Sequence, residues 1–278
     1  MALDVLLRTP ASLDEAFEAL AERGNWTARR SLFRRRCRQL FYDNGSTGVV
    51  FTLDRALVAT GLHVRLNVAR PDFYGRESVE ELAWLSGVLD ADVALLEDNL
   101  PASGFLDVAA LLDAWRGLND QAWDVVTEAG AEFAVLDRTV ADTWWVWQHG
   151  LEDRRARMES IAWLPKVTLL RDASTGRAVR ASTWAEGQAE ALPPTDLVLY
   201  LASVRRPSPL VAIPSEVVRS TLADLLVDGV SDDGVAVSYT PTKWDEEVRQ
   251  RAARLADDYA ELAWDGYRPV AGWQLHDR

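Results

Sequence analysis

The sequence has few of the features on which disulfides and membrane spans depend. Its single cysteine, Cys37, cannot form an internal disulfide, which is typical of proteins in a reducing compartment. The longest uninterrupted apolar run, Leu197 to Ala202, is far shorter than the roughly 20 residues that cross a bilayer. The first residues also lack the long apolar segment and cleavage site of a signal peptide. We therefore expect a cytoplasmic protein that does not bind a membrane.

Catalytic and cofactor motifs are missing as well. The three histidines, His63, His149 and His276, lie far apart in the sequence, and no two have the spacing of a zinc site. There is no Gly-x-Ser-x-Gly nucleophile motif, no phosphate-binding loop and no Gly-x-Gly-x-x-Gly fingerprint. Arginines flank Cys37 and favour its thiolate, but no base is close in sequence, so a small apolar side chain in a strand is the simpler interpretation. The sequence thus predicts no catalytic residue, no metal site and no cofactor.

Acidic side chains outnumber basic ones by 43 to 30, which gives a formal net charge of −13. Nucleic-acid binding depends on lysines and arginines that neutralise phosphates, so nucleic acid is not expected as the primary ligand. Electrostatic complementarity instead speeds the encounter of an acidic protein with a cationic one. The charge therefore favours another protein, a basic one, as the partner.

Residues 1–130 have strand and helix patterns in the order βαβββαα. After a first strand, Ser12 and Glu15 have the spacing of a capping box at the start of a helix. Asn44-Gly45 lies between two β-rich runs and indicates a hairpin. The remaining elements expected here are a strand at 62–68 and helices at 78–89 and 105–128. An antiparallel meander with helices on one face is an α+β arrangement.

Residues 131–278 are expected to form a second α+β half, also a mainly antiparallel sheet covered by helices, with the boundary near residues 129 to 138. Apolar residues from Val140 to Ile161 recur at helical spacing, which predicts one long tryptophan-rich helix with Trp144 and Trp147 in its apolar stripe. Gly150 weakens the middle of this helix by roughly 1 kcal/mol relative to alanine, so a break there is an alternative. The charges that follow Gly150 are expected on the solvent side. Further strands are expected at 165–172, 177–183, 195–203 and 235–239, and helices at 215–226 and from 242 to about 262.

Positive charge is concentrated in one segment, "ARRSLFRRRCRQ". If this segment is a strand, Arg34, Arg36 and Arg38 lie on one face, and Cys37 and Phe41 lie on the other. Such a row of arginines suits a phosphate, a carboxylate ligand or an acidic partner. The alternative is an exposed sheet face whose arginines pair with the surplus carboxylates.

Twelve tryptophans are present, and most lie at positions that predict core packing. Trp145 faces away from the apolar stripe of its helix, so it is the tryptophan expected to contact a second layer, a ligand or a partner. His149 lies four residues further on and forms a candidate binding pair with it, with a capped or solvent-facing imidazole as the alternative. Arg205 and Arg206, in a proline-rich loop, are candidate binding residues too, although a purely structural connection is the alternative.

Three runs resemble segments of an uncharacterised family of bacterial proteins to which no activity is attached. They are "LFYDNGSTGVVFTLD", "LHVRLNVARPDFYGRES" and "TDLVLYLASVRRPSPLVAIPSEV". The resemblance covers the chain in patches, and its motifs are structural in character. It implies a bacterial cytosolic α+β protein and transfers no catalytic residue.

Three functional hypotheses follow. The first is a non-enzymatic binding protein, of the immunity or adaptor type, that binds another protein. The second is an enzyme whose site combines the arginine row with scattered carboxylates. The third is a structural subunit of a bacterial assembly. The acidic charge, together with the lack of a catalytic motif, favours the first.

Overall fold

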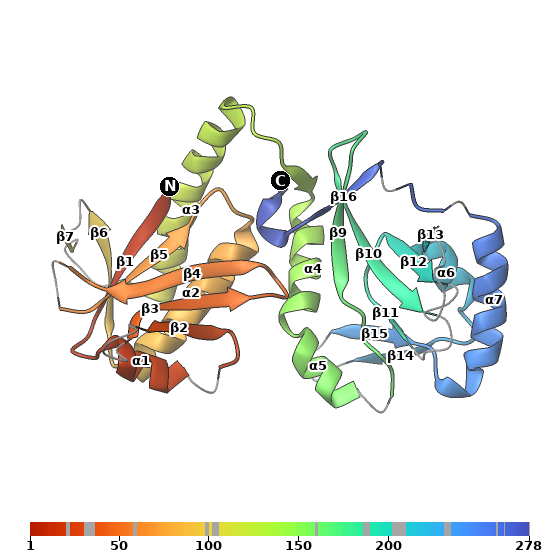
Figure 1. Cartoon of the computed structure of the whole chain (residues 1–278), viewed down its shortest axis with the longest axis horizontal. Coiled ribbons are helices and arrows are strands. Elements are labelled where there is room, and N and C mark those ends of the chain that lie inside the picture. Colours follow the sequence, from red (N-terminus) through yellow and green to blue (C-terminus); the bar gives the residue numbers. More distant parts are fainter. Residues whose placement is uncertain are drawn as a thin grey trace. The chain divides into compact units, whose positions relative to one another are not determined.

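The computed structural model divides into two compact units. Unit 1 comprises Met1–Phe133 with Gly272–His276, and unit 2 comprises Ala134–Ala271 with Asp277–Arg278. Both contain helices and mainly antiparallel sheets, so the predicted α+β class is confirmed (Figure 1). The structure describes residues 1–20, 23–30, 37–57, 60–97, 100–101, 106–158, 161–185, 190–201, 210–230, 235–259, 261–263 and 265–277.

Unit 1 contains a seven-stranded antiparallel sheet in the order β2-β3-β4-β5-β1-β6-β7. The strands are β1 Ala2–Arg8, β2 Trp26–Arg30, β3 Cys37–Asn44, β4 Val49–Arg55, β5 Leu62–Asn67, β6 Asp92–Glu97 and β7 Leu100–Pro101, and the helices are α1 Leu13–Leu20, α2 Asp72–Val88 and α3 Val108–Glu128. Strand β1 pairs antiparallel with both β5 and β6. Together with α1 and α2, strands β1, β4, β5 and β6 follow the split βαβ order of ferredoxin-like folds, and β2 and β3 extend this sheet at one edge.

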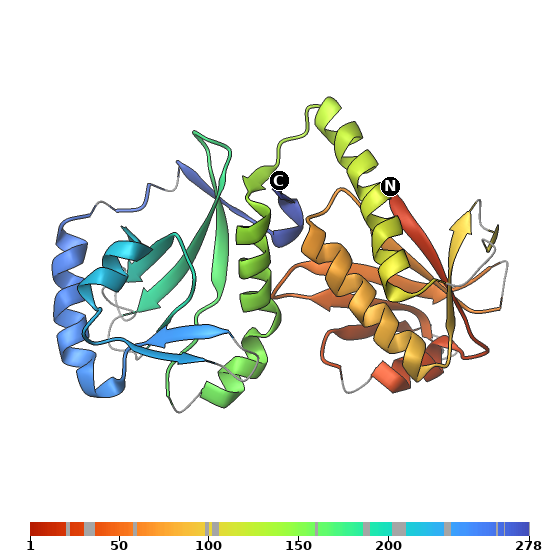
Figure 2. The same cartoon turned by 180° about the vertical axis from the view of Figure 1, so that it is seen from behind.

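The core of unit 1 lies between one face of the sheet and its helices. Alternate residues of β5, such as Leu62, Val64 and Leu66, are buried on that face, as the period of two predicts. Figure 2 shows α2 and α3 in front of the sheet. The two helices approach closely because α2 has a glycine, Gly75, where the ring of Trp115 from α3 packs. A short C-terminal segment also belongs to this unit, and the ring of His276 stacks on that of Trp123 with 4.0 Å between ring centroids.

Local sequence signals in unit 1 are confirmed. The backbone N–H of Ser12 donates to the Glu15 carboxylate at 2.6 Å, and the N–H of Glu15 donates to Ser12 Oγ at 3.3 Å, which is the predicted capping box. The bond from the Ser12 backbone lowers the pKa of Glu15. Strands β3 and β4 form the hairpin predicted at Asn44-Gly45. Strands β2 and β6 were not predicted, because neither has the alternating apolar pattern of a half-buried strand.

Unit 2 contains a five-stranded sheet in the order β13-β12-β10-β9-β16 and a three-stranded sheet in the order β11-β15-β14. Within these two sheets only β10 and β12 pair in parallel. Side chains of α6, α7, β12 and β13 form its main apolar cluster, with Val198, Ile213, Val218 and Val248 among its buried members (Figure 1). The strands are β8 Ala134–Leu136, β9 Val167–Asp172, β10 Ala178–Ala185, β11 Ala191–Leu192, β12 Leu197–Leu201, β13 Leu210–Pro214, β14 Val227–Val230, β15 Ala236–Tyr239 and β16 Tyr267–Val270. The helices are α4 Arg138–His149, α5 Leu151–Met158, α6 Ser215–Thr221, the short η1 Thr242–Trp244 and α7 Asp245–Asp257. The last elements are η2 Gly272–Gln274 and β17 Leu275–Asp277, of which Gly272–His276 belong to unit 1.

The tryptophan-rich helix is interrupted at Gly150, which separates α4 from α5. The expectation of one continuous helix is therefore wrong, and the alternative of a break at the glycine is right. Trp144 and Trp147 are buried, and their indole N–H groups donate to the carbonyls of Val167 and Pro165. Arg154 was expected on the solvent side but is only 1 % exposed, because its guanidinium donates to carbonyls of Val146 and Trp147 at the end of α4.

Candidate functional site

Three of the seven candidate binding residues lie in the described part of the chain: Arg38, Trp145 and His149. The other four, Arg34, Arg36, Arg205 and Arg206, lie outside the described residues. The row of three arginines therefore stays a prediction, and only its last member can be placed.

Arg38 is exposed near the start of β3, next to an irregularity in the pairing of β2 with β3. Arg29 pairs with Gln39, but Arg30 pairs with Cys37, so Arg38 is the extra residue of a β-bulge. The bulge changes which residues share a face. Cys37 is buried as expected, but Phe41 lies on the half-open face while Leu40 and Tyr42 are buried, so the predicted pairing of Phe41 with Cys37 on one face is wrong.

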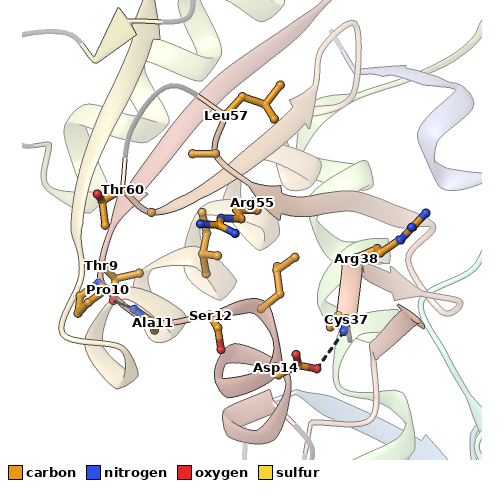
Figure 3. A pocket seen from close by; sticks show the side chains of 14 residues that line it. Thr9, Pro10, Ala11, Ser12, Asp14, Cys37, Arg38, Arg55, Leu57 and Thr60 are labelled. Atoms are coloured by element: carbon orange, nitrogen blue, oxygen red, sulfur yellow. Dashed lines mark hydrogen bonds between the residues drawn. The ribbon is translucent and has the colours of Figure 1, made fainter. Parts of the chain in front are cut away.

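The bulge borders a hollow of about 970 Å³ in unit 1, which we call the Arg55 pocket. Its walls come from the start of α1, the start of β3 and the connection between β4 and β5 (Figure 3). Arg55 points into the pocket toward the side of Thr9 and Thr60, whereas Arg38 turns away from the other lining residues. The pocket is lined by Thr9, Pro10, Ala11, Ser12, Leu13, Asp14, Cys37, Arg38, Arg55, Ala56, Leu57, Thr60, Gly61 and Leu62.

Two acidic groups in or near this pocket already have partners. The Asp14 carboxylate accepts a hydrogen bond from the backbone N–H of Cys37 at 3.0 Å (Figure 3). Burial raises the pKa of the Cys37 thiol, so the thiol is protonated at neutral pH and is a poor nucleophile. Glu15 is held in the capping box. Among the described residues, the charged group that points into the pocket without an ion-pair partner is thus Arg55 (Figure 3).

The pair predicted in α4 is in contact. The rings of Trp145 and His149 lie 5.1 Å apart between centroids, with 36° between their planes. His149 is exposed, but Trp145 is only 8 % exposed. The indole is therefore a buried side chain, and its role in binding stays a prediction.

Three buried carboxylates on α2 were not singled out by the sequence analysis. Glu77 Oε1 accepts hydrogen bonds from Tyr42 Oη, Asn44 Nδ2 and Thr47 Oγ1 at 2.8 to 3.0 Å. Burial, and next the charge of Glu77, raise the pKa of Tyr42, so this phenol remains a donor. The Glu81 carboxylate accepts hydrogen bonds from Arg23 and from the Trp26 indole N–H. The Asp72 carboxylate accepts from Arg116 and forms an ion pair with Arg76. These acids therefore have structural partners. Their only signal in the sequence is their presence within a helical pattern.

The outward face of α3 carries acids that have no such partners in the described part of the chain. Asp120, Asp124 and Glu128 are exposed and four residues apart, so they form one row along the helix, the acidic face of α3. No ion pair joins them to any described cation, and the last turn of α3 contains no basic residue. This row is a region of uncompensated negative charge.

The described residues include no three histidine, cysteine, aspartate or glutamate side chains grouped so as to hold a metal ion. None of the helices in the described part is both long enough and apolar enough to cross a membrane. The molecule is thus an α+β protein of two units, with an arginine-containing pocket and an acidic helix face in unit 1. No family model, no curated protein and no solved structure matches this chain.

Proposed function

We propose that this chain is a cytoplasmic binding protein whose partner is a basic protein, and that the acidic face of α3 makes the first contact with it. The single observation behind this proposal is the row formed by Asp120, Asp124 and Glu128. In a protein of net charge −13, such a row concentrates negative potential on one surface. A protein of the immunity or adaptor kind fits this proposal, and the enzyme and assembly-subunit hypotheses stay predictions.

The row is unfavourable for the isolated helix. Like charges at i and i+4 destabilise a helix by about 0.2–0.5 kcal/mol per pair. Glu128 also lies in the last turn, where the negative end of the helix dipole repels a carboxylate. A cationic partner would relieve both repulsions, and electrostatic attraction of this kind raises the rate of association more than the final affinity.

The test is an affinity pull-down from the cells that encode the chain, with the full-length protein as bait. A triple variant, Asp120→Asn with Asp124→Asn and Glu128→Gln, removes the row without changing side-chain size. We expect the wild type to recover a protein of net positive charge. The triple variant should recover an amount of that protein that is lower by about tenfold or more.

A second triple variant controls for total charge. Asp257→Asn with Asp258→Asn and Glu261→Gln removes three exposed acids from unit 2 by the same kinds of substitution. We expect this control to recover the partner as the wild type does. Equal losses in the two variants, or recovery of an acidic partner, would show that the acidic face of α3 is not the contact surface.

A further inference from the structure

We infer that the Arg55 pocket binds a small organic oxyanion, a molecule with one carboxylate or phosphate group and an aliphatic body. This inference goes beyond the proposed function and does not rest on it. The two sites use different elements of unit 1, since the pocket is lined by α1, β3 and the β4–β5 connection and not by α3.

Its first support is an arginine directed into a hollow of a molecule that is acidic as a whole (Figure 3). Arg55 points into the pocket, and no ion pair joins it to a described carboxylate, whereas Arg38 lines the pocket but turns away from it. The one carboxylate in the lining, Asp14, is held by the Cys37 N–H. Arginine presents several N–H donors in a planar fork that matches carboxylate and phosphate oxygens. Arg55, directed into the pocket beside an acid that is already engaged, therefore favours an anion.

Hydroxyl groups add neutral donors. Ser12 and Thr60 are exposed at the pocket wall, and Ser12 Oγ accepts from the Glu15 N–H, which leaves its own proton to donate. Thr9 is different, because its hydroxyl donates to the Leu89 carbonyl and accepts from the Ala11 N–H. Thr9 thus fixes the wall, while Ser12 and Thr60 are the donors available to a ligand.

The backbone holds these groups in place. Gly61 has a φ of 147°, and a Cβ there would lie 2.2 Å from the carbonyl oxygen of Leu7, so only glycine lets the connection pass so close to β1. The N–H of Ala56 donates to the Gly61 carbonyl at 3.1 Å and closes the connection next to Arg55. This hydrogen bond lies next to Arg55 at the end of β4.

The size and apolar lining of the pocket point to more than a bare inorganic ion. About 970 Å³ is within the range of pockets that hold small organic molecules. Pro10 is exposed at the pocket, and Ala11 and Leu13 also line it. These side chains would contact an aliphatic body while Arg55 binds the anionic group.

The experiment is a titration of the full chain followed by NMR at the Arg55 Nε–Hε resonance. The probes are inorganic phosphate, acetate, butyl phosphate and hexanoate, each compared with chloride at equal ionic strength. We expect saturable shifts, with the longer member of each pair binding more tightly than the shorter one. The tighter of the two series, phosphates or carboxylates, identifies the anionic group.

Variants distinguish binding in the Arg55 pocket from non-specific attraction of the anion to surface arginines. Arg55→Gln should weaken binding of the best probe by about tenfold or more, whereas Asp14→Asn should strengthen it by removing a nearby negative charge. Arg29→Gln removes another exposed arginine of the same sheet, outside the pocket, and should leave binding unchanged. Shifts that match those of chloride, or equal weakening by Arg55→Gln and Arg29→Gln, would overturn the inference.

Discussion

Glu190 is a carboxylic acid buried in unit 2, with 2 % of its surface exposed. Its Oε1 accepts a hydrogen bond from the Ala185 N–H at 3.1 Å, and within the described residues no partner reaches its Oε2. Burial raises the pKa of Glu190 to about 8, far above its ordinary value. The side chain is therefore mainly protonated at neutral pH, and its ionisation opposes folding.

The first prediction concerns this side chain and pH. Because the folded state keeps the proton of Glu190 up to about pH 8 while the unfolded chain loses it near pH 4.5, the free energy of unfolding should fall as pH rises between these values. Glu190→Gln keeps an acceptor for Ala185 and cannot ionise. Denaturant unfolding above pH 8 should show the variant more stable than the wild type by on the order of 3 kcal/mol.

A matched control is Glu261→Gln, which changes an exposed acid of the same unit. Its unfolding free energy should follow that of the wild type across the whole range from about pH 5 to about pH 8.5. Parallel curves for wild type and Glu190→Gln over that range would refute the assignment of a raised pKa.

At the scale of elements, the contact between α2 and α3 depends on the absence of one side chain. A Cβ on Gly75 would lie 2.2 Å from the ring of Trp115, whereas a Cβ on Gly117 of α3 would have no neighbour within 4 Å. Alanine is the better helix former at both positions. The two glycines therefore have opposite roles, one required by packing and one not.

Gly75→Ala should destabilise unit 1 by about 1–3 kcal/mol, because the close contact forces the helices apart. Gly117→Ala should stabilise it by about 0.5–1 kcal/mol through helix propensity alone. Urea unfolding followed by far-UV circular dichroism measures both. The same sign of change in the two variants would contradict the packing argument.

How far the sequence predicts each element depends on the distance over which its causes act. The capping box of Ser12 and Glu15 and the turn at Asn44-Gly45 are local, and both were predicted correctly. The face occupied by Phe41 was predicted wrongly, because the bulge arises from the pairing of β3 with β2. The burial of Arg154 depends on carbonyls that become available only where α4 ends.

The candidate sites differ in the same way. Asp120, Asp124 and Glu128 share a helix face that follows from their spacing alone, although no candidate site was predicted there. The Arg55 pocket had no signal in the sequence, because Ser12, Cys37 and Arg55 belong to three separate segments that only the sheet and α1 bring together. A single arginine in β4 gives no pattern from which a pocket can be inferred.

For the whole molecule, the net charge of −13 acts on stability and on association in opposite directions. Self-repulsion among the carboxylates destabilises the compact state, whereas attraction of a cationic partner speeds encounter. Salt screens both effects, since the Debye length falls to about 10 Å at about 0.1 M. One change of solvent therefore tests the two consequences together.

Raising NaCl from about 20 mM to about 300 mM should stabilise the folded chain by about 1 kcal/mol, or roughly 2 to 4 °C in Tm. Over the same range, the rate of association with the partner recovered by pull-down should fall by about tenfold or more. Scanning calorimetry and stopped-flow fluorescence measure the two quantities.

In the Asp120, Asp124 and Glu128 triple variant, the association rate should be lower at low salt and less sensitive to salt. If that variant keeps the full salt dependence of the wild type, the attraction arises elsewhere on the surface, because screening acts most strongly on the charges that face the partner.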